Sequence, residues 1–155
     1  MFTSPGITVR VVFGFLLPAT VLLTGACDRK TADELPLIPL AVEQPCDIQQ
    51  GCRAGDTDLS LVLMFGQELQ PLKPFPVKVH VQSEIPVTSV TVAFSMANMD
   101  MGQNRYRLIS DGASAWFANV TLPVCSAGRS DWIADIELLA KGRRYKVQLP
   151  FAVGK

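Results

Sequence analysis

Three methionines lie close together in the segment 96–101, at positions Met96, Met99 and Met101. The thioether sulfur of methionine is a soft ligand that suits Cu(I). With this spacing, two or three sulfurs can reach the same side of one loop. His80, the single histidine of the chain, and Cys125 would add an imidazole or a thiolate if the fold brought either of them near. The sequence therefore suggests a Cu(I) site built on the three methionines and His80.

The same methionines also fit a purely structural role. Met96 continues an alternating apolar face with Val92 and Phe94, and methionine fills irregular gaps in protein cores. Met99 and Met101 would then cap one end of the domain. His80 lies on the polar side of its strand, which favours a solvated side chain over a ligand. Under this alternative the domain is a structural or interaction module of the cell envelope and binds no metal.

Three cysteines, Cys46, Cys52 and Cys125, follow the N-terminal region. In an oxidising compartment they predict one disulfide and one remaining thiol. The bridge either closes the short loop from Cys46 to Cys52 or joins Cys125 to one of these two. We favour the bridge to Cys125, because a longer closed loop stabilises more in the chain-entropy view. The remaining cysteine is free, bound to metal, or buried and inert.

Enzymatic chemistry is poorly supported. Cys46 and Cys52 lack the Cys-x-x-Cys spacing and the following helix of a thiol–disulfide oxidoreductase. No serine–histidine–aspartate arrangement and no glycine-rich phosphate loop is present. Asp100, Asp111 and Asp131 fit turn positions better than catalytic ones. We therefore expect a non-catalytic protein.

The N-terminus predicts export. A single cation, Arg10, precedes the apolar run 11–23, which is too short to span a bilayer, and small residues then lead to Cys27. The sequence LTGAC (23–27) resembles the lipobox of bacterial lipoproteins, although Thr24 stands where that family usually has leucine. The resemblance implies a signal peptide over 1–26 and acylation of Cys27, with palmitate among the chains. The alternative is an ordinary cleaved signal that leaves Cys27 as a free thiol.

Residues 27–45 are expected to form a tether between the lipid and a folded domain. The segment 28–44 has mixed charge, and Pro36 and Pro39 prevent a helix. The alternative is that 35–42 forms an edge strand on the domain. Asp28 resembles the residue that retains enterobacterial lipoproteins in the inner membrane. We therefore expect a lipid-anchored envelope protein that faces the periplasm from the inner membrane.

The part of the chain from Cys46 to Lys155 alternates apolar and polar residues, which is typical of strands with one buried face. The turn sequences Asp111-Gly112 and Lys141-Gly142 separate neighbouring strands. About seven strands are expected, near 59–63, 77–81, 90–96, 105–110, 116–122, 132–138 and 145–151. The sequence thus predicts an all-β fold, a single immunoglobulin-like β-sandwich over 46–155.

The charge balance argues against a nucleic-acid partner. Removal of 1–26 takes away Arg10 and no acidic residue, so the positive charges fall from 14 to 13 against 14 negative charges. A near-neutral domain lacks the basic excess that nucleic-acid binding requires.

Two segments, FSMANMDMGQNR (94–105) and LPVCSAGRSDW (122–132), resemble a group of small proteobacterial exported lipoproteins of unassigned function. These occur in company with copper and cytochrome-oxidase assembly factors. A looser likeness is to the β-sandwich domains of FixH-like and YtkA-like proteins, which often carry histidines beside their methionines, as this stretch does not. The resemblance implies a membrane-anchored lipoprotein that binds or delivers copper for oxidase assembly, with envelope proteins of copper handling as partners.

Overall fold

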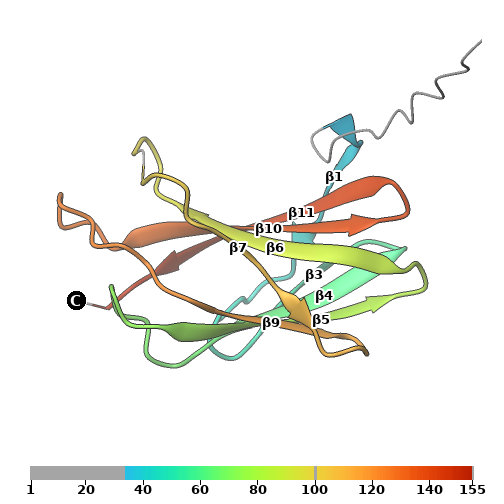
Figure 1. Cartoon of the computed structure of the whole chain (residues 1–155), viewed down its shortest axis with the longest axis horizontal. Coiled ribbons are helices and arrows are strands. Elements are labelled where there is room, and N and C mark those ends of the chain that lie inside the picture. The colour runs from blue at the N-terminus through green and yellow to red at the C-terminus, as the bar shows by residue number, and fades with distance from the viewer. Residues whose placement is uncertain (1–33, 100, 155) are drawn as a thin grey trace, which may run out of the picture.

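The computed structural model describes residues 34–99 and 101–154, and these form two packed β-sheets (Figure 1). The strands are β1 (Leu37–Pro39), β2 (Ala41–Val42), β3 (Cys52–Gly55), β4 (Leu59–Phe65), β5 (Phe75–Ser83), β6 (Val87–Ser95), β7 (Arg105–Arg107), β8 (Ile109–Ser110), β9 (Ala115–Val120), β10 (Asp131–Ala140) and β11 (Arg143–Ala152). The predicted all-β sandwich is confirmed.

The sheets have the strand orders β1-β11-β10-β6-β7, here called sheet A, and β2-β3-β4-β5-β9-β8, here called sheet B. All pairs are antiparallel except β1 with β11. Consecutive strands repeatedly change sheet, as from β5 to β6 and from β9 to β10. Sequence neighbours therefore often face each other across the core instead of pairing edge to edge.

Alternation of side chains explains the core. In β10 every second residue from Trp132 to Ala140 is buried, and β11 repeats the pattern from Tyr145. At one end of the core the rings of Phe65 and Phe151 pack edge to face, with centroids 5.2 Å apart, and Phe94 adjoins both. Each large apolar side chain buried in this way contributes roughly 1.5–3 kcal/mol.

The structure has eleven strands among its described residues, more than the seven expected. Strands β1, β2 and β3 are two to four residues long, which is too short to show a clear alternation. The strand expected over 105–110 divides at the buried Leu108. Its first half, β7, joins sheet A and its second half, β8, joins sheet B.

The expected free tether over 27–45 is wrong from Leu37 onward. β1 pairs with β11, Leu40 donates its backbone N–H to the Lys146 carbonyl at 2.8 Å, and β2 then pairs with β3 in the other sheet. The alternative of an edge strand describes this segment better. The predicted signal peptide and Cys27 lie outside the described residues.

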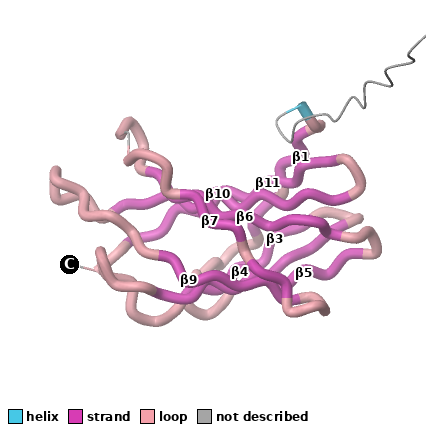
Figure 2. The backbone as a smooth tube through the Cα atoms, in the orientation of Figure 1, coloured by secondary structure: helices cyan, strands magenta, loops and turns pink. Residues whose placement is uncertain are grey.

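Strand directions give the sandwich two distinct ends. The β10–β11 hairpin turns at Lys141-Gly142, where both residues have positive φ, as a tight two-residue turn requires. β1 enters beside this turn. The loop residues 96–99, 101–104 and 121–130 and the end of β11 lie at the opposite end (Figures 1 and 2). Ten-residue strands such as β10 separate the two ends by about 30 Å. We call this second end the sulfur pole. No helix among the described residues is long and apolar enough to cross a membrane.

Candidate sulfur site at one pole of the sandwich

The first loop of the sulfur pole is a tight turn directly after β6. Met99 donates its backbone N–H to the Met96 carbonyl at 3.3 Å, and the two residues form an isolated β-bridge. Asn98 has φ 58°, a left-handed conformation that asparagine tolerates better than most residues. The turn returns the chain over the end of the core, so that the Met99 side chain packs against it.

The second loop carries Cys125 from β9 toward β10. It is closed by a turn in which Gly128, at φ 70°, donates its N–H to the Cys125 carbonyl at 3.0 Å. Tyr106 of β7 anchors its start, because its hydroxyl donates to the Thr121 carbonyl at 2.7 Å and accepts from the Thr121 N–H at 3.2 Å. The cysteine is therefore held on a defined backbone.

Arg129 ties the two loops together. Its Nη1 donates to the Ala97 carbonyl of the first loop at 2.9 Å, and its Nε donates to Asp131 Oδ1 at 2.9 Å. A second hydrogen bond joins Arg129 Nη2 to Asp131 Oδ2. These bonds raise the pKa of Arg129 and lower the pKa of the Asp131 carboxyl. The pair thus stays charged while it fixes the spacing of the loops.

The two loops bring a thiol and a thioether into contact. Cys125 Sγ donates to Met99 Sδ across 3.5 Å. Two metal–sulfur bonds of about 2.3 Å, meeting at a tetrahedral or trigonal angle, place their sulfurs about 3.8–4.0 Å apart. The observed pair would have to open by only a few tenths of an ångström to share one ion.

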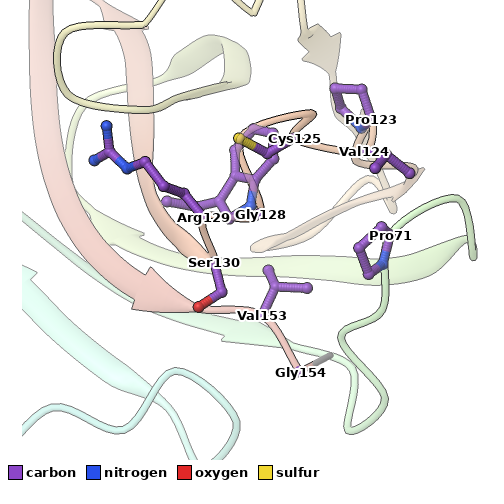
Figure 3. A pocket seen from close by; sticks show the side chains of 10 residues that line it. Pro71, Pro123, Val124, Cys125, Gly128, Arg129, Ser130, Val153 and Gly154 are labelled. Carbon is purple, nitrogen blue, oxygen red and sulfur yellow. The ribbon is translucent and has the colours of Figure 1, made fainter.

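The surroundings of this pair are apolar. Met96 and Cys125 are 3% and 8% exposed, and Met99 and Met101 are half-buried against the core. Next to Cys125 lies a hollow of about 300 Å³. Its walls are formed by Pro71, Pro123, Val124, Cys125, Gly128, Arg129, Ser130, Trp132, Val153 and Gly154 (Figure 3). Cys125 is thus one wall of a hollow large enough for a small ion or a partner side chain.

His80 does not belong to this site, which corrects the predicted ligand set. It lies on the outer face of sheet B, paired between Val62 and Ala115, while Met96 points into the core from sheet A. His80 is also distant from the pole along its strand. Phe75, at the start of β5, contacts the ring of Phe94 beside the pole, and His80 lies five residues further along β5, a distance of about 17 Å. In the sequence, the position of His80 among polar residues on one face of its strand already favoured a solvated side chain over a metal ligand.

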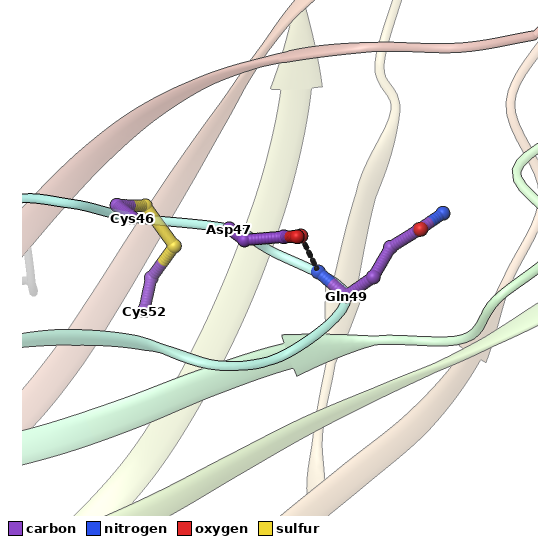
Figure 4. The surroundings of a disulfide bond; sticks show 4 residues. All are labelled: Cys46, Asp47, Gln49 and Cys52. Carbon is purple, nitrogen blue, oxygen red and sulfur yellow. Dashed lines mark hydrogen bonds between the residues drawn. A yellow bond between two sulfur atoms is a disulfide. The ribbon is translucent and has the colours of Figure 1, made fainter.

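The disulfide joins Cys46 to Cys52, so the favoured bridge to Cys125 is wrong (Figure 4). The intervening residues fold into a turn in which Asp47 Oδ1 accepts from the Gln49 N–H at 2.9 Å and the Asp47 carbonyl accepts from the Gly51 N–H at 2.8 Å. This brings the two Cα atoms to 4.8 Å. Cys125 remains a free, buried thiol.

Hard metal ions find no comparable cluster in the described part of the chain, where no group of three or more histidine, cysteine, aspartate or glutamate side chains is close enough to hold a metal ion. The soft sulfur pair is therefore the arrangement with the clearest ligand chemistry.

Comparison with known proteins adds little to this description. No protein-family model and no curated protein matches the chain. One similar solved structure is a crystal structure of an engineered protein, target OR128 of the Northeast Structural Genomics Consortium. It is 20% identical, with a TM-score of 0.45, and the match covers 61% of this chain and 20% of that one.

Proposed function

We propose that this chain is a non-catalytic, lipid-anchored envelope protein that binds one Cu(I) ion at the sulfur pole and delivers it to a partner. The observation that carries the proposal is the 3.5 Å contact between Cys125 Sγ and Met99 Sδ. Neither sulfur is engaged in the disulfide, which uses Cys46 and Cys52.

The chemistry of the donors supports a monovalent soft ion. A thiolate with one or two thioethers favours Cu(I), whereas thioethers add little affinity for Zn²⁺ or Ca²⁺. Cys125 must lose its proton to bind, so uptake releases one proton and weakens as the pH falls. Met96, which is in the core, and Met101, which packs against the core, are the candidates for a third sulfur.

The surroundings support delivery as well as binding. The hollow lined by Cys125 would give a partner side chain access to an ion bound at this cysteine. Cu(I) transfer between proteins requires such access, since the incoming ligand must bind before the outgoing one leaves. The predicted export signal and acylation of Cys27 would hold the site in the periplasm. The resemblance to exported lipoproteins implies copper-handling partners and a role in oxidase assembly in the same compartment.

Competition titration tests the binding. The reduced chain should take up one Cu(I) from a chromophoric chelator, and Cys125→Ser or Met99→Leu should weaken that uptake at least tenfold. Met64→Leu is the matched control, because Met64 is exposed on the outer face of sheet B, on the side of that sheet opposite the core. Uptake that is unchanged in Cys125→Ser, or equal uptake of Zn²⁺, would contradict the site.

The second candidate function is an envelope interaction module without metal. The observation in its favour is that the sulfur pair also packs on the core, since Cys125 is buried and Met99 is half-buried against it. In that case no Cu(I) is taken from the chelator. Met99→Ala together with Met101→Ala would instead lower the free energy of unfolding by about 2–5 kcal/mol if both side chains fill the core.

A further inference from the structure

The two sheets differ in whether their strands carry acidic residues. The strands of sheet B contain no aspartate or glutamate, and their charged or titratable side chains are Arg53, Lys78 and His80. All three point outward. The strands of sheet A contain acidic residues, among them Asp135 and Glu137, which pair with Lys146 at 3.1 Å and with Arg105 at 3.5 Å. Sheet A therefore pairs two of its cations with carboxylates on its own strands, whereas the strands of sheet B offer no carboxylate.

The outer face of sheet B also carries an apolar row. The register aligns Ile109 with Phe117, Phe117 with Lys78, and Lys78 with Met64. The three apolar members are 64%, 46% and 37% exposed, respectively. With strands about 4.8 Å apart, four adjacent strands make a row of about 14 Å. We call this row and the neighbouring cations the basic-apolar face.

A second row, which contains Arg53 and His80, lies directly beside the first. The register places Arg53 opposite Val62, Val62 opposite His80, and His80 opposite Ala115. Glu43, just after β2, lines the same hollow as Arg53 and His80. The centre of the face thus remains basic and the acidic groups stay in the flanking loops.

We propose that the basic-apolar face rests on the surface of an anionic lipid bilayer. The apolar side chains would enter the headgroup region, and Lys78 and Arg53 would be attracted to the anionic lipid headgroups. The inference rests on the lipid anchor of the proposed function. It adds an orientation that the anchor alone does not impose.

A second copy of the chain fits this face less well. Symmetric dimers use the same patch on both subunits. Pairing the basic-apolar face with itself would bring Lys78 and Arg53 toward their own counterparts, and the strands of the face offer no carboxylate to neutralise them. Like charges brought together in an interface cost several kcal/mol. The charge of the face therefore favours a lipid surface over self-association.

The chain between Cys27 and β1 is long enough for this arrangement. The ten residues 27–36 separate the lipid anchor from β1, and a chain of this length spans at most about 33–36 Å. Because β1 belongs to sheet A and sheet B would face the lipid, this stretch has to cross the thickness of the sandwich. Packed sheets are about 10 Å apart, which is well within its reach. With sheet B on the lipid, the sulfur pole faces sideways along the membrane, within reach of an acceptor embedded in the same bilayer.

Oxidative footprinting of the full, processed chain on vesicles tests the orientation. Hydroxyl radicals should modify Met64 and Phe117 several-fold more slowly on vesicles that contain phosphatidylglycerol than on pure phosphatidylcholine. Val124 and Leu72, which are exposed elsewhere, are the internal references and should react equally on both. Equal reactivity of Met64 and Phe117 on the two vesicles overturns the proposal.

Charge variants and protein density separate the remaining explanations. Lys78→Glu should remove the protection of Met64, whereas Arg107→Glu, on sheet A, should leave it unchanged. If Met64 and Phe117 become protected on phosphatidylcholine vesicles as more protein is bound per vesicle, a second copy of the chain covers the face. That result would overturn the proposal that the face rests on lipid. If the chain does not float with phosphatidylcholine vesicles, the lipid anchor is disproved. The Cu(I) site is tested separately by the competition titration. Failure of the anchor and failure of the copper site are therefore distinguishable from failure of the orientation.

Discussion

Tyr145 lies in the core of the sandwich, fully buried on β11. Its hydroxyl has no hydrogen-bond partner among the described protein atoms. An unsatisfied buried polar group costs about 1–3 kcal/mol. Tyr145→Phe keeps the ring and removes that group, so we expect the free energy of unfolding to rise by about 1 kcal/mol. Urea denaturation measures the change, and a clear loss of stability would show that the hydroxyl is satisfied in solution.

Asp131 makes the stability of the sulfur pole depend on pH. The hydrogen bonds from Arg129 lower the pKa of its carboxyl below the ordinary 3.8, while desolvation opposes the shift. A lowered folded-state pKa adds stability that is present above the unfolded-state pKa and is lost as the pH falls through the folded value.

The Asp131→Asn variant tests this dependence. It should melt at a lower temperature than the wild type at pH 7, and the difference should shrink as the pH falls well below 3.8. Because the pair is exposed, the effect should be small and should weaken with salt. A melting-temperature difference that is constant over this pH range would contradict the assignment.

At the scale of elements, the crossing from β1 to β2 closes one edge of the sandwich. Leu40 lies between the two strands and is buried, although it belongs to a segment expected to be a tether. We expect Leu40→Ala to lower the free energy of unfolding by about 2–5 kcal/mol, as a cavity in a core does. Leu37→Ala, at an exposed position of the same segment, is the control and should change stability little.

The disulfide stabilises the turn that leads into β3. Cross-linking a loop this short, from Cys46 to Cys52, stabilises by about 2 kcal/mol in the chain-entropy account. Replacing both cysteines by alanine should lower the unfolding free energy by that amount. Peptide mapping without reduction should recover the Cys46–Cys52 link, and a linked peptide that contains Cys125 would contradict it.

In the whole molecule, the fold separates the end at which β1 enters from the sulfur pole. β1 enters beside the β10–β11 turn, and the sulfur loops lie at the other end of the same strands (Figure 1). If Cys27 is acylated, cells grown with labelled palmitate should incorporate the label into this chain. Cys27→Ala should abolish the labelling and Cys125→Ala should preserve it, because Cys125 is buried in the fold. Label that persists in Cys27→Ala would disprove the anchor.

The sequence by itself determined the local features of this protein. Alternation along 59–63, 77–81, 90–96, 132–138 and 145–151 placed long strands and their buried faces correctly, and it placed Met96 in the core. The Lys141-Gly142 step identified the hairpin between the last two strands. These features are readable because side-chain period and turn conformation depend on residues adjacent in the chain.

Only the tertiary structure decided which distant residues meet. The contact of Met99 with Cys125 depends on two loops brought together by the order of strands in two sheets, and periodicity carries no information on that order. For the same reason the sequence could not exclude His80 from the sulfur site, choose the partner of Cys46, or align Ile109, Phe117 and Met64 across four strands. Each of these depends on register and sheet assignment, which the fold sets through contacts between segments far apart in the chain.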